Sequence, residues 1–243
     1  KEKKKMRTKF INPPNIGWIE SKLEKSHMNF LWNIIEESKK KNISHKDKLV
    51  GHVTNSLELE DKDDWFMKNC LISNINSYYK SNGEKHPILQ YSSIEGKAAI
   101  SLGRFWVNYQ YQTEFNPYHD HSGLYSFVIW MKIPYSHEDQ KKVKLVKGMR
   151  KTDIKAGIFE IQYLNMLGQT RAFPYHMKPE LEGTMLIFPS SLRHCVYPFY
   201  ECEKPRISIS GNLYIDVLPE EKPMTTNIHN QQSDIIRNIV EAK

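Results

Sequence analysis

Six short stretches rich in aromatic and β-branched residues follow one another between Ala98 and Val217, and polar turn residues lie between them. Such stretches are typical of β-strands. They span residues 98–102, 105–112, 125–133, 158–164, 184–188 and 206–217. Because no helical repeats separate them, the pattern favours an antiparallel sandwich or barrel over a parallel sheet with crossover helices. We therefore predict an α+β chain that is mainly β.

Helical patterns flank this strand-rich region. Apolar residues recur at helical spacing between Ile19 and Lys41, and again between Asp61 and Ser81. Near the other end of the chain, Ser233 is a suitable N-cap for a short helix. The chain is thus predicted to have three regions. They are a helical part over residues 1–90 that braces the core, the core over residues 91–218, and a tail with a helix over residues 219–243.

The composition sets broad limits on location and partners. The net charge of +7 and the pI of about 9.1 permit attraction to nucleic acid or to an acidic partner but do not require it. Lysines gather between residues 134 and 156, which could form a mobile loop near the mouth of a barrel or an ordinary solvated connection. Three cysteines at no familiar metal-binding spacing favour a reducing compartment, so we expect a cytoplasmic protein. No apolar run approaches the roughly 20 residues that span a bilayer, and no membrane partner is expected.

Three histidines form the strongest chemical signal. His119 and His121 are two residues apart, so on an extended strand both rings leave the same side. His194, which follows the predicted strand at residues 184–188, can close a site with them. Asp120 would face the opposite way on a regular strand. A pair of surface histidines is the plain alternative, but three histidines on or beside strands suggest a mononuclear non-haem iron centre.

A second signal lies on the last predicted strand. Arg206 and Ser208 share one strand face, and an arginine in such a place can grip a carboxylate as a rigid fork. The plain alternative is a half-buried strand with one solvent-exposed face. Tyr109 and Tyr111 share a face on an earlier strand and could add hydrogen bonds to the same acid, although aromatic residues at this spacing more often belong to a core.

Four segments of the chain together resemble the 2-oxoglutarate and Fe(II)-dependent oxygenases, nearest to their prolyl-hydroxylase-like branch. They are TEFNPYHDHSG at residues 113–123, SFVI at 126–129, FPS at 188–190 with His194, and RISISGN at 206–212. The resemblance covers about half of the chain. It implies a double-stranded β-helix with Fe(II) and 2-oxoglutarate as cofactors. It also implies that His119 and His194 bind the iron and that Arg206 and Ser208 bind a carboxylate of 2-oxoglutarate.

The same resemblance implies the reaction. Oxygen and 2-oxoglutarate would be consumed, succinate and CO2 would be released, and a substrate C–H bond would be hydroxylated. Prolyl hydroxylation is the first single candidate, although a peptide, a nucleic acid and a small molecule all stay open as substrates. A rival from another class is a non-enzymatic, cupin-like metal-binding module, which would keep the metal without binding 2-oxoglutarate.

One position departs from the pattern of the family. The family's carboxylate ligand stands two residues after the first histidine, and here that residue is His121. Asp120 could ligate instead through a local twist of the chain. Alternatively, His121 could be the first ligand, with Gly123 at the carboxylate position as in related halogenases. We favour His119, His121 and His194 as the metal ligands, with Asp120 as the main rival.

Overall fold

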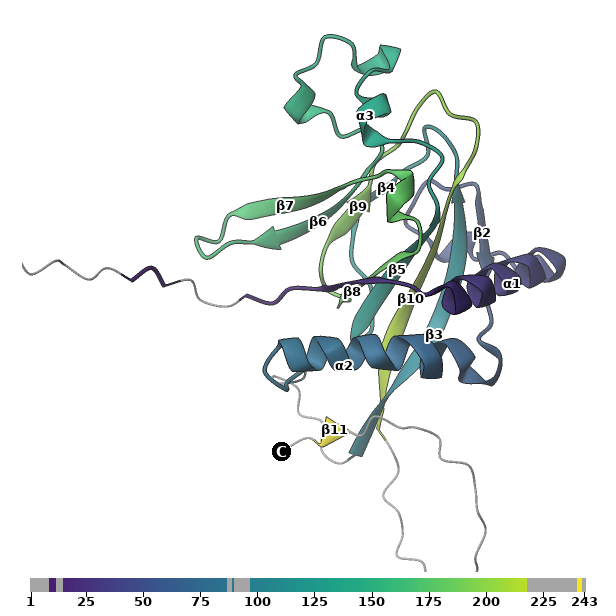
Figure 1. Ribbon diagram of the computed structural model, residues 1–243, viewed down its shortest axis with the longest axis vertical. Helices are drawn as coiled ribbons and strands as arrows, with labels where there is room; N and C mark the ends of the chain where they lie inside the picture. The colour runs from purple at the N-terminus through teal and green to yellow at the C-terminus, as the bar shows by residue number, and fades with distance from the viewer. Residues whose placement is uncertain (1–8, 12–14, 87–88, 90–96, 218–239, 242–243) are drawn as a thin grey trace, which may run out of the picture.

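The computed structural model describes residues 9–11, 15–86, 89, 97–217 and 240–241. Two antiparallel sheets form its centre (Figure 1). The first sheet has the strand order β1-β8-β5-β10-β3-β11, and β2 also pairs with β3. Its strands are β1 (Ile19–Lys22), β2 (Asn55–Glu58), β3 (Lys97–Gln110), β5 (Tyr125–Lys132), β8 (Thr184–Pro189), β10 (Arg206–Val217) and β11 (Val240–Glu241). The second sheet has the order β4-β9-β6-β7, with β4 (Asn116–His119), β6 (Ile158–Leu164), β7 (Thr170–His176) and β9 (His194–Val196).

The path of the chain through these sheets is that of a double-stranded β-helix. From β3 to β10 it visits the first, second, first, second, second, first, second and first sheet in turn. Strands that are far apart in sequence, such as β3 and β10, therefore pair over most of their length. This jelly-roll topology confirms the predicted fold class, an α+β chain that is mainly β.

Helices cover the outer face of the first sheet. Helix α1 (Lys25–Lys41) and helix α2 (Ile72–Ser81), which continues a π-helical turn at Met67–Leu71, lie across it (Figure 1). Ile35 and Ile75 of these helices belong to the same buried cluster as Ile129 and Ile209 of the sheet. This packing confirms helices at both predicted places in the first third of the chain.

No described helix has the length and apolar character that crossing a membrane requires.

A second buried cluster fills the space between the two sheets. Trp130 from β5 and Phe188 from β8 meet Phe159 and Ile161 from β6 there, and each is at most 2% exposed. Large rings at adjacent positions fill this space densely. The cluster forms one wall of the pocket described below.

Several predicted boundaries were wrong. Ile19–Lys22 is strand β1 on the edge of β8 and not the start of a helix. The predicted strands at 98–102 and 105–112 are one strand, β3, because its partner β10 runs alongside both with one register shift. Most of the predicted C-terminal helix after Ser233 lies outside the described residues, and its Val240 belongs with Glu241 to strand β11, which pairs with β3. The lysine-rich residues 134–156 contain the short helix α3 (His137–Gln140) and two 3-10 turns.

Candidate metal centre

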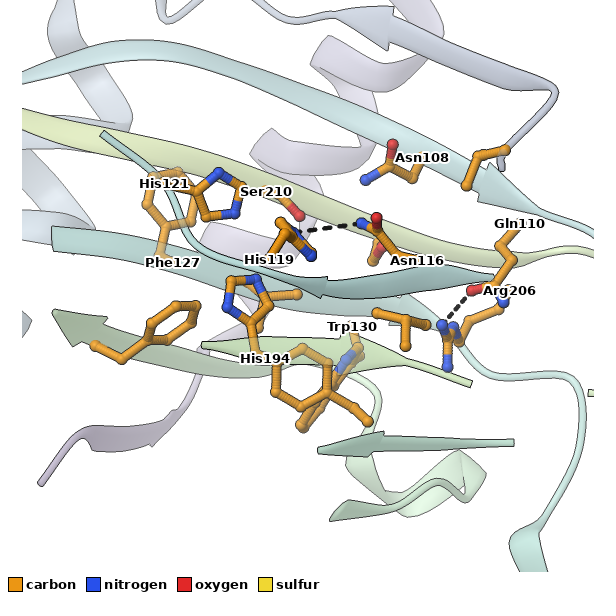
Figure 2. Close-up of a pocket in the computed structure, with 16 residues that line it drawn as sticks. Asn108, Gln110, Asn116, His119, His121, Phe127, Trp130, His194, Arg206 and Ser210 are labelled. Atoms are coloured by element: carbon orange, nitrogen blue, oxygen red, sulfur yellow. Dashed lines mark hydrogen bonds between the residues drawn. The ribbon is translucent and has the colours of Figure 1, made fainter. Parts of the chain in front are cut away.

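Three histidine side chains meet between the sheets (Figure 2). His119 ends β4, and its direct cross-strand partner is His194, the first residue of β9. His121 lies two residues beyond β4, where its backbone N–H donates to the Ser190 carbonyl at 2.9 Å. The ring centroids lie 4.3 to 5.1 Å apart. One ligand nitrogen from each ring lies within 4.8 Å of the others, and this is the one such group of three potential ligands among the described residues.

Hydrogen bonds to the backbone orient two of the rings. His119 Nδ1 lies 2.7 Å from the Pro117 carbonyl oxygen, and His194 Nδ1 lies 3.0 Å from the Leu192 carbonyl oxygen. A carbonyl oxygen can only accept, so Nδ1 carries the proton in both rings. The lone pair then lies on Nε2, which is the arrangement that a metal-binding histidine uses.

Burial keeps the three rings neutral. It lowers the pKa of His119, lowers that of His121 to about 4, and holds that of His194 well below its ordinary value of 6.5. The neighbouring imidazoles lower the values of His121 and His194 further, because two cations would repel each other at this distance. Neutral imidazoles suit divalent iron and its first-row neighbours, so the donor set fits the implied metal.

The two rivals for the third ligand occupy different surroundings. Asp120 is exposed to solvent and does not belong to the histidine group. Gly123 has a backbone φ of +107°, and a Cβ there would lie 2.8 Å from the Leu213 carbonyl oxygen. A tight turn against β10 therefore accounts for this glycine without any role at a metal.

A buried arginine lies in the same pocket, beyond the histidines (Figure 2). Arg206 is 3% exposed. Its Nη1 donates to the Tyr135 hydroxyl at 2.9 Å, and its Nη2 donates to Oε1 of Gln110. Among the described residues no carboxylate pairs with it, which leaves a buried positive charge held by neutral groups alone. Ser208 and Ser210 follow on the same strand face and also line the pocket.

The structure places Tyr109 and Tyr111 away from this pocket. Tyr109 packs in the cluster on the helix side of the sheet, where Lys39 Nζ lies 5.9 Å from its ring centre. Tyr111 lies beyond the end of β3 and is 39% exposed. The register of β3 against β10 sets Gln110 opposite Arg206 and Asn108 opposite Ser208, so the residues next to the tyrosines face the pocket.

Sequence reasoning missed four polar residues of the pocket region: Asn108, Gln110, Asn116 and Tyr135. Alternation along the strand carried a signal for Asn108 and Gln110, since they share the face opposite to Tyr109. Tyr135 follows β5 in a loop, and no pattern in the sequence pointed to it.

A family model described as "Putative 2OG-Fe(II) oxygenase" matches residues 104–212, a segment that contains the three histidines and Arg206. No curated protein matches the chain significantly. Among solved structures, a prolyl-4-hydroxylase from Pseudomonas putida is 12% identical, with a TM-score of 0.45 over 82% of this chain and 92% of that chain. An oxidoreductase of the 2OG-Fe(II) oxygenase family from Burkholderia pseudomallei is 12% identical, with a TM-score of 0.33 over 68% and 65%.

Proposed function

We propose that this chain, whose residues 104–212 belong to the 2OG-Fe(II) oxygenase family, hydroxylates its substrate and converts 2-oxoglutarate to succinate and CO2. Membership of the family makes the chain an Fe(II)- and 2-oxoglutarate-dependent dioxygenase that uses O2. The observation that carries the finer proposal is one pocket with two parts. It holds three imidazole nitrogens within 4.8 Å of one another, and a buried arginine without an acidic partner among the described residues.

In this proposal His119, His121 and His194 bind Fe(II). Two of the rings are already oriented by their Nδ1 bonds to backbone carbonyls, so little ordering is needed when the metal binds. The bound iron and 2-oxoglutarate supply the oxidising chemistry. The chain supplies orientation, and the rings of Trp130, Phe159 and Phe188 keep water from that side of the pocket.

Arg206 binds the carboxylate of 2-oxoglutarate that lies farther from the metal. A buried guanidinium favours an anionic partner strongly, and a carboxylate can take both ends of its fork. Ser208 lies on the same face and can donate its hydroxyl to that carboxylate. Gln110 and Tyr135 already contact the guanidinium and hold it toward the pocket.

A prolyl residue in a peptide is the first substrate to test, and nucleic acids and small molecules follow it. A cytoplasmic location stays a prediction. The halogenase-like alternative needs Gly123 at a ligand position. The turn against Leu213, which leaves no room for a side chain, already explains why this residue is glycine. A cupin-like module that only binds a metal would not need a buried, carboxylate-binding arginine such as Arg206.

An anaerobic titration tests the proposal. Fe(II) and 2-oxoglutarate are added to the metal-free protein, and the visible charge-transfer absorption of chelated iron is followed in wild type, His121→Ala and Asp120→Ala. We expect the band in wild type and in Asp120→Ala, and its loss in His121→Ala. Loss in Asp120→Ala alone would move the third ligand to Asp120. Absence of the band in wild type would overturn the proposed function.

A further inference from the structure

A bulge in β4 turns Asn116 into the pocket beside His119. Asn116 pairs with Val196 and His119 pairs with His194, so three steps along β4 match two steps along β9. On a regular strand, residues three apart face opposite sides; the extra residue brings both side chains to the same face. Pro117 lies within the bulge, where a residue without a backbone N–H is tolerated. Both Asn116 and His119 line the pocket.

The amide of Asn116 lies beside the nitrogen that faces the metal. Its Nδ2 is 3.5 Å from His119 Nε2, at the outer limit of a hydrogen bond (Figure 2). Two ligands bound at right angles to one metal ion lie about 3 Å apart, given metal–nitrogen bonds of about 2.1 Å. The amide is therefore next to the volume that the metal and its other ligands would occupy.

The hydrogen-bonding capacity of this amide is almost unused. Asn116 Oδ1 is buried and has no partner among the described residues. Gly51 packs closely against the Asn116 side chain and limits its movement, because even a methyl group on Gly51 would lie only 2.6 Å from Oδ1. The backbone beside it is tied down as well, because His52 N–H donates to the Phe115 carbonyl at 2.8 Å. A ligand oxygen needs a donor. Asn116 Nδ2 carries two N–H groups, and its one partner among the described residues is His119 Nε2 at 3.5 Å, so an N–H is left for a partner in the pocket.

From this geometry we infer that Asn116 is a co-substrate-positioning residue of the site. Its side-chain N–H donates a hydrogen bond to an oxygen of 2-oxoglutarate bound at the metal, on the side of His119. The inference rests on the proposed function, because it needs both the metal and 2-oxoglutarate in the pocket. It adds a neutral donor close to the metal, whereas Arg206 acts at the far end of the same molecule.

The test separates binding of the metal from binding of 2-oxoglutarate. Fe(II) affinity is measured first without 2-oxoglutarate, and 2-oxoglutarate affinity is then measured anaerobically with saturating Fe(II). For Asn116→Ala we expect unchanged Fe(II) affinity, an approximately tenfold weaker 2-oxoglutarate affinity and a shifted charge-transfer band, as fits the loss of one bond to a charged group. For Asn116→Asp we expect a larger loss of 2-oxoglutarate affinity, because two carboxylates repel each other.

A pair of glycine variants controls for structural effects. Gly51→Ala would push against the Asn116 side chain, and it should weaken 2-oxoglutarate binding in the same direction. Gly17→Ala has open space around its new methyl group and should change nothing. Circular dichroism confirms that each variant is folded.

Three results would overturn parts of this reasoning. Unchanged 2-oxoglutarate affinity and an unchanged band in folded Asn116→Ala would refute the inference. Weaker Fe(II) binding in that variant without 2-oxoglutarate would also refute it, by making Asn116 a metal ligand. Wild-type protein that binds no 2-oxoglutarate would refute the proposed function itself.

Discussion

Replacing the buried arginine by methionine should separate ligand binding from folding. Arg206→Met keeps an unbranched side chain of similar length in the core but removes the charge. The free energy of unfolding of the ligand-free protein then has two opposing changes. Two buried acceptors, Tyr135 Oη and Gln110 Oε1, lose their donor at about 1–3 kcal/mol each. Removal of a buried, unpaired charge stabilises the folded state by several kcal/mol. We expect a net change within about 2 kcal/mol.

The effect on 2-oxoglutarate binding should be much larger. Loss of a buried partner to a carboxylate costs about 2–5 kcal/mol of binding free energy, which is at least about 30-fold in Kd. At a free 2-oxoglutarate concentration of 100 times the wild-type Kd, ligand binding stabilises the wild type by about 2.7 kcal/mol. At the same concentration the variant would gain less than about 1 kcal/mol.

Thermal unfolding with and without 2-oxoglutarate measures this difference. Mn(II) replaces Fe(II) so that no turnover occurs. For a chain of this length 1 kcal/mol corresponds to about 2–4 °C, so 2-oxoglutarate should raise the Tm of wild type by about 5–11 °C and that of Arg206→Met by only a few degrees. A full shift in the variant would refute the assignment of Arg206 to the carboxylate.

Two further predictions concern stability. Burial lowers the pKa of His45, His86 and His137 below the ordinary 6.5, so below that pH the unfolded chain takes up protons that the folded chain does not. Stability should be fully present above pH 6.5 and should fall as the pH drops below it, and urea unfolding at pH 7.5 and 5.5 checks this; equal stability would contradict it. Gly123→Ala should destabilise by about 1–3 kcal/mol, because it forces a φ of +107° on alanine and crowds the Leu213 carbonyl. An unchanged Tm would show that the turn tolerates the methyl group.

The long strands could be predicted from the sequence because their side chains report their surroundings. In β5 and β8 nearly every residue is buried, and runs of aromatic and branched residues mark such strands clearly. Strand β9 has three residues and β4 has four, which is too short for a periodicity to be recognised. Strand β7 is exposed along most of its length and carries Pro174, which argues against a strand, so it was not predicted.

The candidate site was only half predictable for a related reason. Residues with distinctive chemistry, the histidines and Arg206, could be named from spacing alone. Their neutral partners could not, because Gln110 reaches the pocket only through the register of β3 against β10. Asn116 reaches it only through the bulge in β4. The prediction that His119 and His121 share a strand face was wrong, because His121 lies beyond the end of β4. Its ring nevertheless meets those of His119 and His194.

The charge of the pocket leads to a last prediction. Among the described residues that line it, Arg206 is the one charged side chain, and the three imidazoles are neutral. A divalent metal would make the site strongly positive, and dianionic 2-oxoglutarate would offset most of that charge. His121→Asp places a negative charge at the third ligand position, so it should tighten metal binding and weaken 2-oxoglutarate binding, each by tenfold or more. Separate titrations of Mn(II) and of 2-oxoglutarate measure both. Because an aspartate placed away from the metal would change neither affinity, unchanged values would show that His121 is not a ligand.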